Sequence, residues 1–358
     1  MATSNAATNY LERRVLDFVF KNNSLSFATP NNDIYVGLAT GSYIAIEADA
    51  GKIVEVQVDT DDANYTRQQV TAANWKQSTT TLAVALTSSA TSIILTDAEA
   101  FPASGNIIIG DEIITYTGKG GSTVTATVNG AVSSSANVTV DAVVGTLTVG
   151  QVVTGTGISG TVRVATVNSQ TSIVLSSAVS LSDDVALNFD GSNTLTGATR
   201  GAHNTTSTGP AAAHSASAVV VCETQRVIND NNIEFAAAAG TASTYSVTQA
   251  FIADKNIATA LVNGAVSSSA NVAVNTNNGT IAVGDVVTGT GISGTVRVAT
   301  VNSQASIVLD TAVSISDNVL LTFDGANKLF VGALDASKTI AVGDIFRINA
   351  GNLSIELK

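Results

Sequence analysis

Three groups of residues in this chain have types and spacings that could support chemistry. Gly155, Gly157 and Gly160 reproduce the glycine spacing of dinucleotide-binding loops, in which a pyrophosphate rests on the N-terminus of a helix that follows a strand. The residues after Gly160 are β-branched at nearly every other position, which predicts a strand where such a loop needs a helix. We interpret these glycines as turn residues and expect no cofactor-binding residues.

An acidic segment is the second group. Asp59, Asp61 and Asp62 precede Asn64 and could offer hard oxygen ligands to calcium. The spacing of a calcium-binding loop fails at Ala63, and no later glutamate is placed to bind in a bidentate way. The segment therefore predicts a solvated loop.

The two histidines are the third group. His203 and His214 flank a loop of Ser, Thr, Gly and Pro residues, and could hold a metal or face each other across a trimer axis. Neither has a cysteine or a carboxylate near it in the sequence, so we interpret both as plain loop residues and expect no metal site.

Catalytic residues are not expected either. Neither histidine lies near a Gly-x-Ser-x-Gly turn, and no pair of carboxylates stands out for hydrolysis. The alternative of a glycan-active enzyme with accessory β-modules needs such a pair and sugar-stacking aromatic residues. Aromatic residues make up only 5% of the chain, and Trp75 is its one tryptophan.

An internal duplication determines how these residues are positioned. Residues 128–191 recur without a gap as residues 262–325, a constant shift of 134, and direct comparison shows 49 of the 64 aligned positions to be identical. Two copies separated by unrelated sequence indicate small domains inserted into loops of a host fold. The repeated part holds no histidine or cysteine, so the duplication favours a role in shape over catalysis.

We predict a mainly β protein in which an antiparallel β-sandwich core carries one N-terminal helix, over residues 9–21, and nested inserted β-sandwich modules. Core strands are expected over residues 34–39, 43–46 and 53–58, the last with a valine face buried and a Glu55 and Gln57 face in water. The predicted domains are a discontinuous core (1–77, 219–257 and 327–358), an inserted β-module (78–127 and 192–218), and β-sandwich repeats at 128–191 and 258–326.

Composition excludes several classes of protein. A net charge of −12, with no basic cluster larger than Arg13 and Arg14, argues against nucleic-acid binding. Cys222 is the only cysteine, and no run of 18 apolar residues is present to span a bilayer. The N-terminal segment lacks the apolar stretch of a secretory signal, which also argues against a bacterial adhesin.

Several segments outside the modules share residue patterns with a known family. They are Thr8, Asn9, Tyr10, Glu12, Leu16 and Asp17; Ile34–Leu38; Tyr65, Arg67, Val70 and Trp75; Tyr245–Asp254; and 329–339, 343–348 and 350–357. Together they resemble a family of small tailed-bacteriophage virion proteins, often described as tail-fibre-like, over about 150 of the 358 residues. Tyr245 departs from the resemblance, because the family segment usually begins with tryptophan. The inserted modules resemble repeats of phage structural proteins.

The resemblance implies a non-enzymatic structural protein of the virion, made in the host cytoplasm and released on lysis. It favours the tail (fibre, baseplate or tip) over the alternative of a capsid decoration protein. Expected partners are other virion proteins, copies of the chain itself in a trimer, and a host cell-surface glycan or protein contacted by projecting modules. Neither nucleic acid nor membrane insertion is expected.

Overall fold

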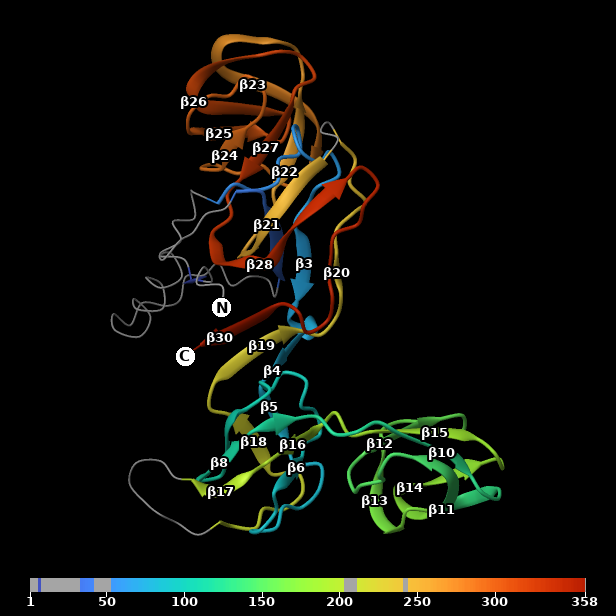
Figure 1. The fold of residues 1–358 in the computed structure, drawn as a ribbon. Coiled ribbons are helices and arrows are strands. Elements are labelled where there is room, and N and C mark those ends of the chain that lie inside the picture. The colour runs from blue at the N-terminus through green and yellow to red at the C-terminus, as the bar shows by residue number, and fades with distance from the viewer. Residues whose placement is uncertain (1–5, 8–32, 42–52, 203–210, 241–243, 358) are drawn as a thin grey trace. The chain divides into compact units, whose positions relative to one another are not determined.

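The computed structural model describes residues 6–7, 33–41, 53–202, 211–240 and 244–357. This part is mainly β, with one short 3-10 helix, η2 (Ala72–Asn74), and no α-helix (Figure 1). The predicted helix at residues 9–21, the predicted strand at 43–46, and His203 lie outside the described residues. No helix of the described part is long and apolar enough to cross a membrane. The chain divides into two compact units: the first comprises Met1–Trp75 and Asn231–Ala350, the second Lys76–Asp230 and Gly351–Lys358.

The first unit is built on an antiparallel five-stranded sheet with the order β1-β28-β21-β2-β3. Its inner face buries a small cluster that includes Ala39, Ile53, Phe251 and Val331. The predicted strand at residues 34–39 is confirmed as β2. A two-stranded pair, β20 with β29, completes this part of the unit. The bounds are β1 (Ala6–Ala7), β2 (Asp33–Ala39), β3 (Gln68–Thr71), β20 (Ile233–Glu234), β21 (Thr244–Ala253), β28 (Lys328–Ala341) and β29 (Arg347–Ile348).

The segment at residues 53–58 differs from its prediction. It forms only an isolated bridge, between Glu55 and Ala39, and no regular strand. Val54 is 53% exposed whereas Glu55 is 7% exposed, so at these two positions the expected faces are reversed. The reason is a buried charge partner, Arg67, which binds the Glu55 carboxylate and which strand alternation cannot reveal.

The second unit contains two small sheets packed around a common core. One has the order β6-β16-β9 and the other β17-β8-β7-β18-β5. Their shared cluster is apolar and includes Leu95, Phe101, Ile107, Tyr116 and Leu195. A further sheet, β30-β19-β4, also belongs to this unit, except for Trp75, the first residue of β4. The bounds are β4 (Trp75–Gln77), β5 (Thr79–Thr81), β6 (Ser92–Ile94), β7 (Gly105–Ile109), β8 (Glu112–Tyr116), β9 (Gly118–Lys119), β16 (Thr194–Thr196), β17 (Thr199–Ala202), β18 (Val219–Cys222), β19 (Gln225–Asn229) and β30 (Ser354–Leu357).

Each repeat forms a closed six-stranded barrel rather than the predicted sandwich. Barrel 1 belongs to the second unit, and barrel 2 to the first. Barrel 1 consists of β10 (Val124–Val128), β11 (Val132–Val144), β12 (Val152–Gly155), β13 (Val162–Ser169), β14 (Ser172–Leu181) and β15 (Ala186–Asp190). Barrel 2 consists of β22 (Ala258–Val262), β23 (Val266–Asn278), β24 (Val286–Thr288), β25 (Val296–Ser303), β26 (Ser306–Ile315) and β27 (Leu320–Asp324).

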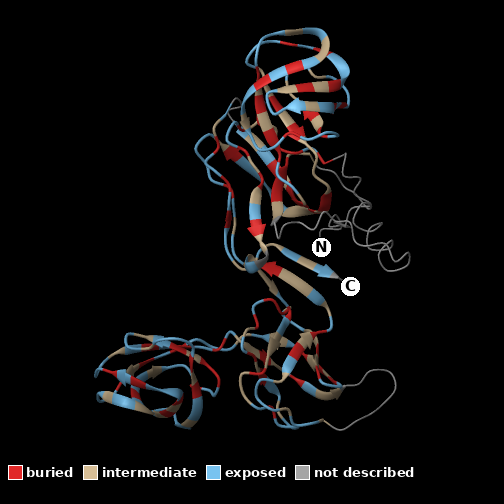
Figure 2. Cartoon of the chain, turned by 180° about the vertical axis from the view of Figure 1, so that it is seen from behind, coloured by how far each residue is buried: buried red, intermediate tan, exposed pale blue. Residues whose placement is uncertain are grey.

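Bent strands explain why the barrels close. Buried and exposed positions alternate along the barrel strands (Figure 2). Along β10, Val124, Ala126 and Val128 belong to the core while the residues between them are less buried. The long strand β11 pairs with β10 through its second half and with β14 through its first half, with register shifts in both ladders. Such irregularities bend a strand, so β11 can belong to both sides of the barrel. Closure leaves no open sheet edge in either repeat.

Each barrel begins four residues before the duplicated sequence becomes obvious, at Val124 in one copy and at Ala258 in the other. The two chain segments that enter and leave barrel 1 approach each other closely at Gly121 and Gly191. A Cβ on Gly121 would lie 2.9 Å from the carbonyl oxygen of Gly191, so glycine is required there. The segment 327–358 is shared between the units, since β28 and β29 belong to the first and β30 pairs with β19 in the second. β18 likewise pairs with β5 and β7 of the second unit.

Candidate functional site

The glycine pattern forms the connection between β12 and β13. Gly157 has φ +88°, and a Cβ there would lie 2.7 Å from the carbonyl oxygen of Ser180. Gly160 also has a positive φ, +69°, with open space around it. The segment continues directly into β13, so no helix N-terminus is present to receive a phosphate. The interpretation as turn glycines is confirmed for Gly157 and Gly160, whereas Gly155 is the last residue of β12. In the copy, Gly291 and Gly294 also have positive φ.

The acidic segment is a closed turn whose carboxylates are occupied. Asp61 accepts a hydrogen bond from the Gln57 backbone N–H (2.9 Å). Asp62 is buried and accepts bonds from the N–H groups of Asn64 (3.0 Å) and Ala239 (2.9 Å) and from the Tyr245 hydroxyl (2.9 Å). The predicted solvated loop is therefore wrong for Asp62, which fastens the turn to the segments at Ala239 and Tyr245. No set of three His, Cys, Asp or Glu side chains that could hold a metal occurs among the residues that the structure describes.

His214 has a carboxylate partner, contrary to its interpretation as a plain loop residue. Its Nε2 atom lies 2.7 Å from Oε2 of Glu112, which Arg200 also binds through Nε (2.9 Å) and Nη2 (2.8 Å). Burial raises the pKa of the Glu112 carboxyl, but the bonds from Arg200 and His214 outweigh it and lower the pKa to about 2. Backbone N–H groups of Gly201 and Ala212 bind the same carboxylate. Glu112 is thus fully engaged within the fold and has no free face for a substrate.

A second buried ion cluster joins barrel 2 to its host sheet. Arg67 donates to both oxygens of Glu55 (2.8 and 2.6 Å), to Asp324 at the end of β27 (2.8 Å), and to the carbonyl of Lys255 (2.8 Å). Lys328 Nζ also binds Asp324 (2.8 Å). Burial lowers the pKa of Arg67, but the two carboxylates outweigh this effect and hold the guanidinium in its charged form. Burial raises the pKa of Asp324, but Arg67 and Lys328 outweigh this effect and lower it to about 2. The cluster is a structural clamp.

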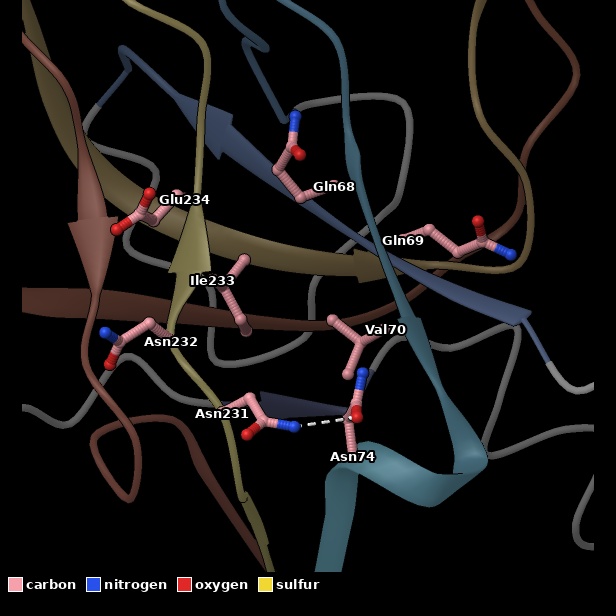
Figure 3. A pocket seen from close by; sticks show the side chains of 8 residues that line it. All are labelled: Gln68, Gln69, Val70, Asn74, Asn231, Asn232, Ile233 and Glu234. Carbon is pink, nitrogen blue, oxygen red and sulfur yellow. Dashed lines mark hydrogen bonds between the residues drawn. The ribbon is translucent and has the colours of Figure 1, made fainter.

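A polar cavity of ≈ 310 Å³ lies in the first unit, between β3 and the segment that leads into β20 (Figure 3). Val70 and Ile233 point toward each other across it, and both are buried. At one end the amide of Asn231 donates to Oδ1 of Asn74 (2.9 Å). The lining residues are Gln68, Gln69, Val70, Asn74, Asn231, Asn232, Ile233 and Glu234.

The barrels present a second candidate surface at the end opposite to chain entry and exit. There the connections at residues 129–131, 156–161 and 182–185, and their copies at 263–265, 290–295 and 316–319, form what we call the distal end. All of these residues are exposed except Ile158 and Val185 and their copies. Direct comparison shows that 12 of the 13 distal positions are identical between the copies, against 5 of 9 in the proximal connections at 145–151 and 170–171.

The distal connections are also held together in the same way in both barrels. Asp183 accepts a bond from the Gly130 N–H (2.6 Å), and Asp317 accepts the equivalent bond from Gly264 (2.7 Å). Gly130, Gly157, Gly160 and Asp183 shape the connections themselves. The other exposed distal positions usually tolerate substitution within about 0.5 kcal/mol, so folding alone does not require identity there. The proximal ends differ where each barrel meets a different host segment.

Sequence reasoning did not identify the cavity, the Arg67 cluster or the Glu112 cluster. The pair Asn231 and Asn232 and the pair Gln68 and Gln69 were a visible signal, but their wide separation along the chain hid the fact that they line one cavity. Comparison with protein-family models, with curated proteins and with solved structures gave no match.

Proposed function

We propose that this chain is a structural protein of a tailed-bacteriophage virion, associated with the tail, and that its two barrels contact the host surface. The observation that carries the proposal is the arrangement of the resembling segments. Ile34–Leu38, the region of Val70, Tyr245–Asp254 and 329–339 lie far apart in the chain, yet they provide the adjacent strands β2, β3, β21 and β28 of one sheet. Segments that belong to one ancestral domain are expected to assemble in this way once the insertions are set aside.

The barrels supply the contact role in this proposal. Two barrels with matching distal ends give each chain two equivalent weak contacts, and many chains on one particle add these contacts through avidity. The distal connections contain no lysine or arginine and carry Asp183, Asp184 and Asp317, so the proposed partner is a host-surface glycan or protein without a strong negative charge. A trimer of the chain would carry six such ends.

Cryo-electron microscopy of purified virions tests the location. Density for the two barrels at the tail supports the proposal, density on the capsid facets would make the chain a decoration protein, and a particle without the chain would reject a virion role.

A matched pair of double variants tests the contact. Thr156→Lys with Thr290→Lys places a charge on both distal ends, whereas Thr146→Lys with Thr280→Lys places it at exposed, identical positions of both proximal ends. We expect only the distal pair to weaken adsorption of particles to host cells. Equal adsorption by both pairs would contradict a role of the distal ends.

A further inference from the structure

The cavity between β3 and β20 has the chemistry of a site for a small uncharged ligand. No lysine, arginine or histidine lines it, so an anionic group would find no opposite charge. Its one carboxylate, Glu234, is already ion-paired with Arg347, which leaves no unpaired negative charge for a cation. An entirely apolar ligand would shield the polar lining from water and form no hydrogen bond with the donors and acceptors that the protein does not already engage.

The side chains that face the cavity combine amides with an apolar floor. Gln68, Asn74 and Asn231 each carry a donor and an acceptor, which is the pattern that complements hydroxyl groups. Between these amides, Val70 and Ile233 are 2% and 5% exposed and offer an apolar surface for C–H groups. A ligand that bonds to the amides and also packs on this apolar surface must be rich in hydroxyl groups and have an apolar ring face.

The amides are already held in place by the protein. Asn231 donates to Asn74, and Gln68 Nε2 donates to the Thr66 carbonyl (3.0 Å). On the other side of the strand, Asn232 accepts from the Ala350 N–H (3.0 Å). Side chains fixed in this way lose little conformational entropy on binding, which favours affinity for a small ligand.

We propose that this cavity binds one ring of a neutral sugar. Its volume of ≈ 310 Å³ is at the lower end of the range for ligand sites, about 300–1,000 Å³, and suits a single ring rather than a longer chain. This site is separate from the distal ends of the barrels and does not depend on the proposed location in a virion.

Saturation-transfer NMR on the full chain tests the site, with the methyl glycosides of glucose, galactose, mannose and N-acetylglucosamine as probes. We expect transfer to at least one probe, with a dissociation constant on the order of 1 mM for a ligand of this size. Asn231→Leu and Gln68→Leu remove an amide at different places in the cavity and should each weaken binding about tenfold or more. Asn168→Leu, an exposed asparagine of barrel 1, is the matched control and should leave binding unchanged.

Thermal unfolding of each variant first establishes that it is folded. Two cavity variants are used so that, if one does not fold, the other still tests the site. Absence of transfer to all four probes at about 20 mM would overturn the proposal. So would equal binding by the wild type and both cavity variants. A change of oligomeric state in the cavity variants, seen by light scattering without any sugar binding, would assign the cavity to a contact between chains instead.

Discussion

Removal of the Arg67 guanidinium should destabilise the first unit strongly. The side chain is fully buried, and among the residues that the structure describes it is the only group that forms short ion pairs with both Glu55 and Asp324. In Arg67→Ala, Glu55 would keep the Tyr65 hydroxyl (2.8 Å) and a distant contact with Lys328 (3.8 Å). A buried carboxylate would thus lose its main compensation for desolvation.

The expected loss is about 3–5 kcal/mol, the cost of removing one partner from a buried ion pair. For a unit of this size that corresponds to a fall in melting temperature of roughly 10 °C. Hydrogen-exchange mass spectrometry in increasing urea is the appropriate assay, because it reports each segment separately. Protection should fall in β2, β21 and β28 of the first unit and stay unchanged in β7 and β8 of the second.

Arg297→Ala is the matched control, because Arg297 belongs to the same unit and is exposed, and its guanidinium donates a hydrogen bond to the Gly284 carbonyl (2.9 Å) and makes no ion pair among the described residues. It should cost less than about 1 kcal/mol. The double variant Arg67→Met with Glu55→Gln should recover part of the loss, since no unpaired charge then remains on Glu55. Equal destabilisation by Arg67→Ala and Arg297→Ala would refute the assignment of the cluster as a clamp.

Three further predictions concern the second unit and the barrels. Because the pKa of Glu112 falls from 4.5 to about 2 on folding, the ionised carboxylate contributes about 3 kcal/mol to stability above pH 4.5. This contribution is lost as the pH falls toward 2. Glu112→Gln should remove the dependence of stability on pH in this range, as measured by an acid titration followed by circular dichroism. Gly157→Ala should destabilise barrel 1 by about 2–3 kcal/mol in urea titrations, because the new Cβ would lie too close to the Ser180 carbonyl oxygen. Gly160→Ala should cost only about 1 kcal/mol, because the space around Gly160 is open. Equal losses of stability in the two variants would contradict the close contact at Gly157. Ala258 and Phe323 lie opposite each other on paired strands, so an Asn-Gly turn can replace the residues between them. This variant should leave the rest of the first unit folded, with its Arg67–Asp324 ion pair. Loss of hydrogen-exchange protection in β21 would show instead that barrel 2 is needed for folding.

Much of the local structure could be predicted from the sequence. The strand at residues 34–39, the turn role of Gly157 and Gly160, and the mainly β class follow from side-chain alternation and from the positions of glycine. These features depend on residues close together in the chain, so a local pattern is sufficient to specify them.

The candidate sites could not be predicted in the same way. Glu55 looked like a residue of a wet strand face because its partner, Arg67, lies beyond an intervening turn. His214 looked isolated because Glu112 is 102 residues away in the chain. The amide cavity combines two segments that are equally ordinary when each is considered alone. Burial of a polar side chain depends on such distant partners, and hydrophobic periodicity carries no information about them.

The sequence by itself determined that two copies of one module exist, because 49 identities at a constant shift of 134 require the same fold, and the strand bounds of the two barrels agree at that shift in five of six pairs. Only the tertiary structure decided that each copy closes into a barrel and that β30 pairs with β19 in the second unit. The physical reason is that alternation specifies which side of a strand is buried, whereas closure and strand partners depend on register, bulges and hydrogen bonds between segments distant in the chain.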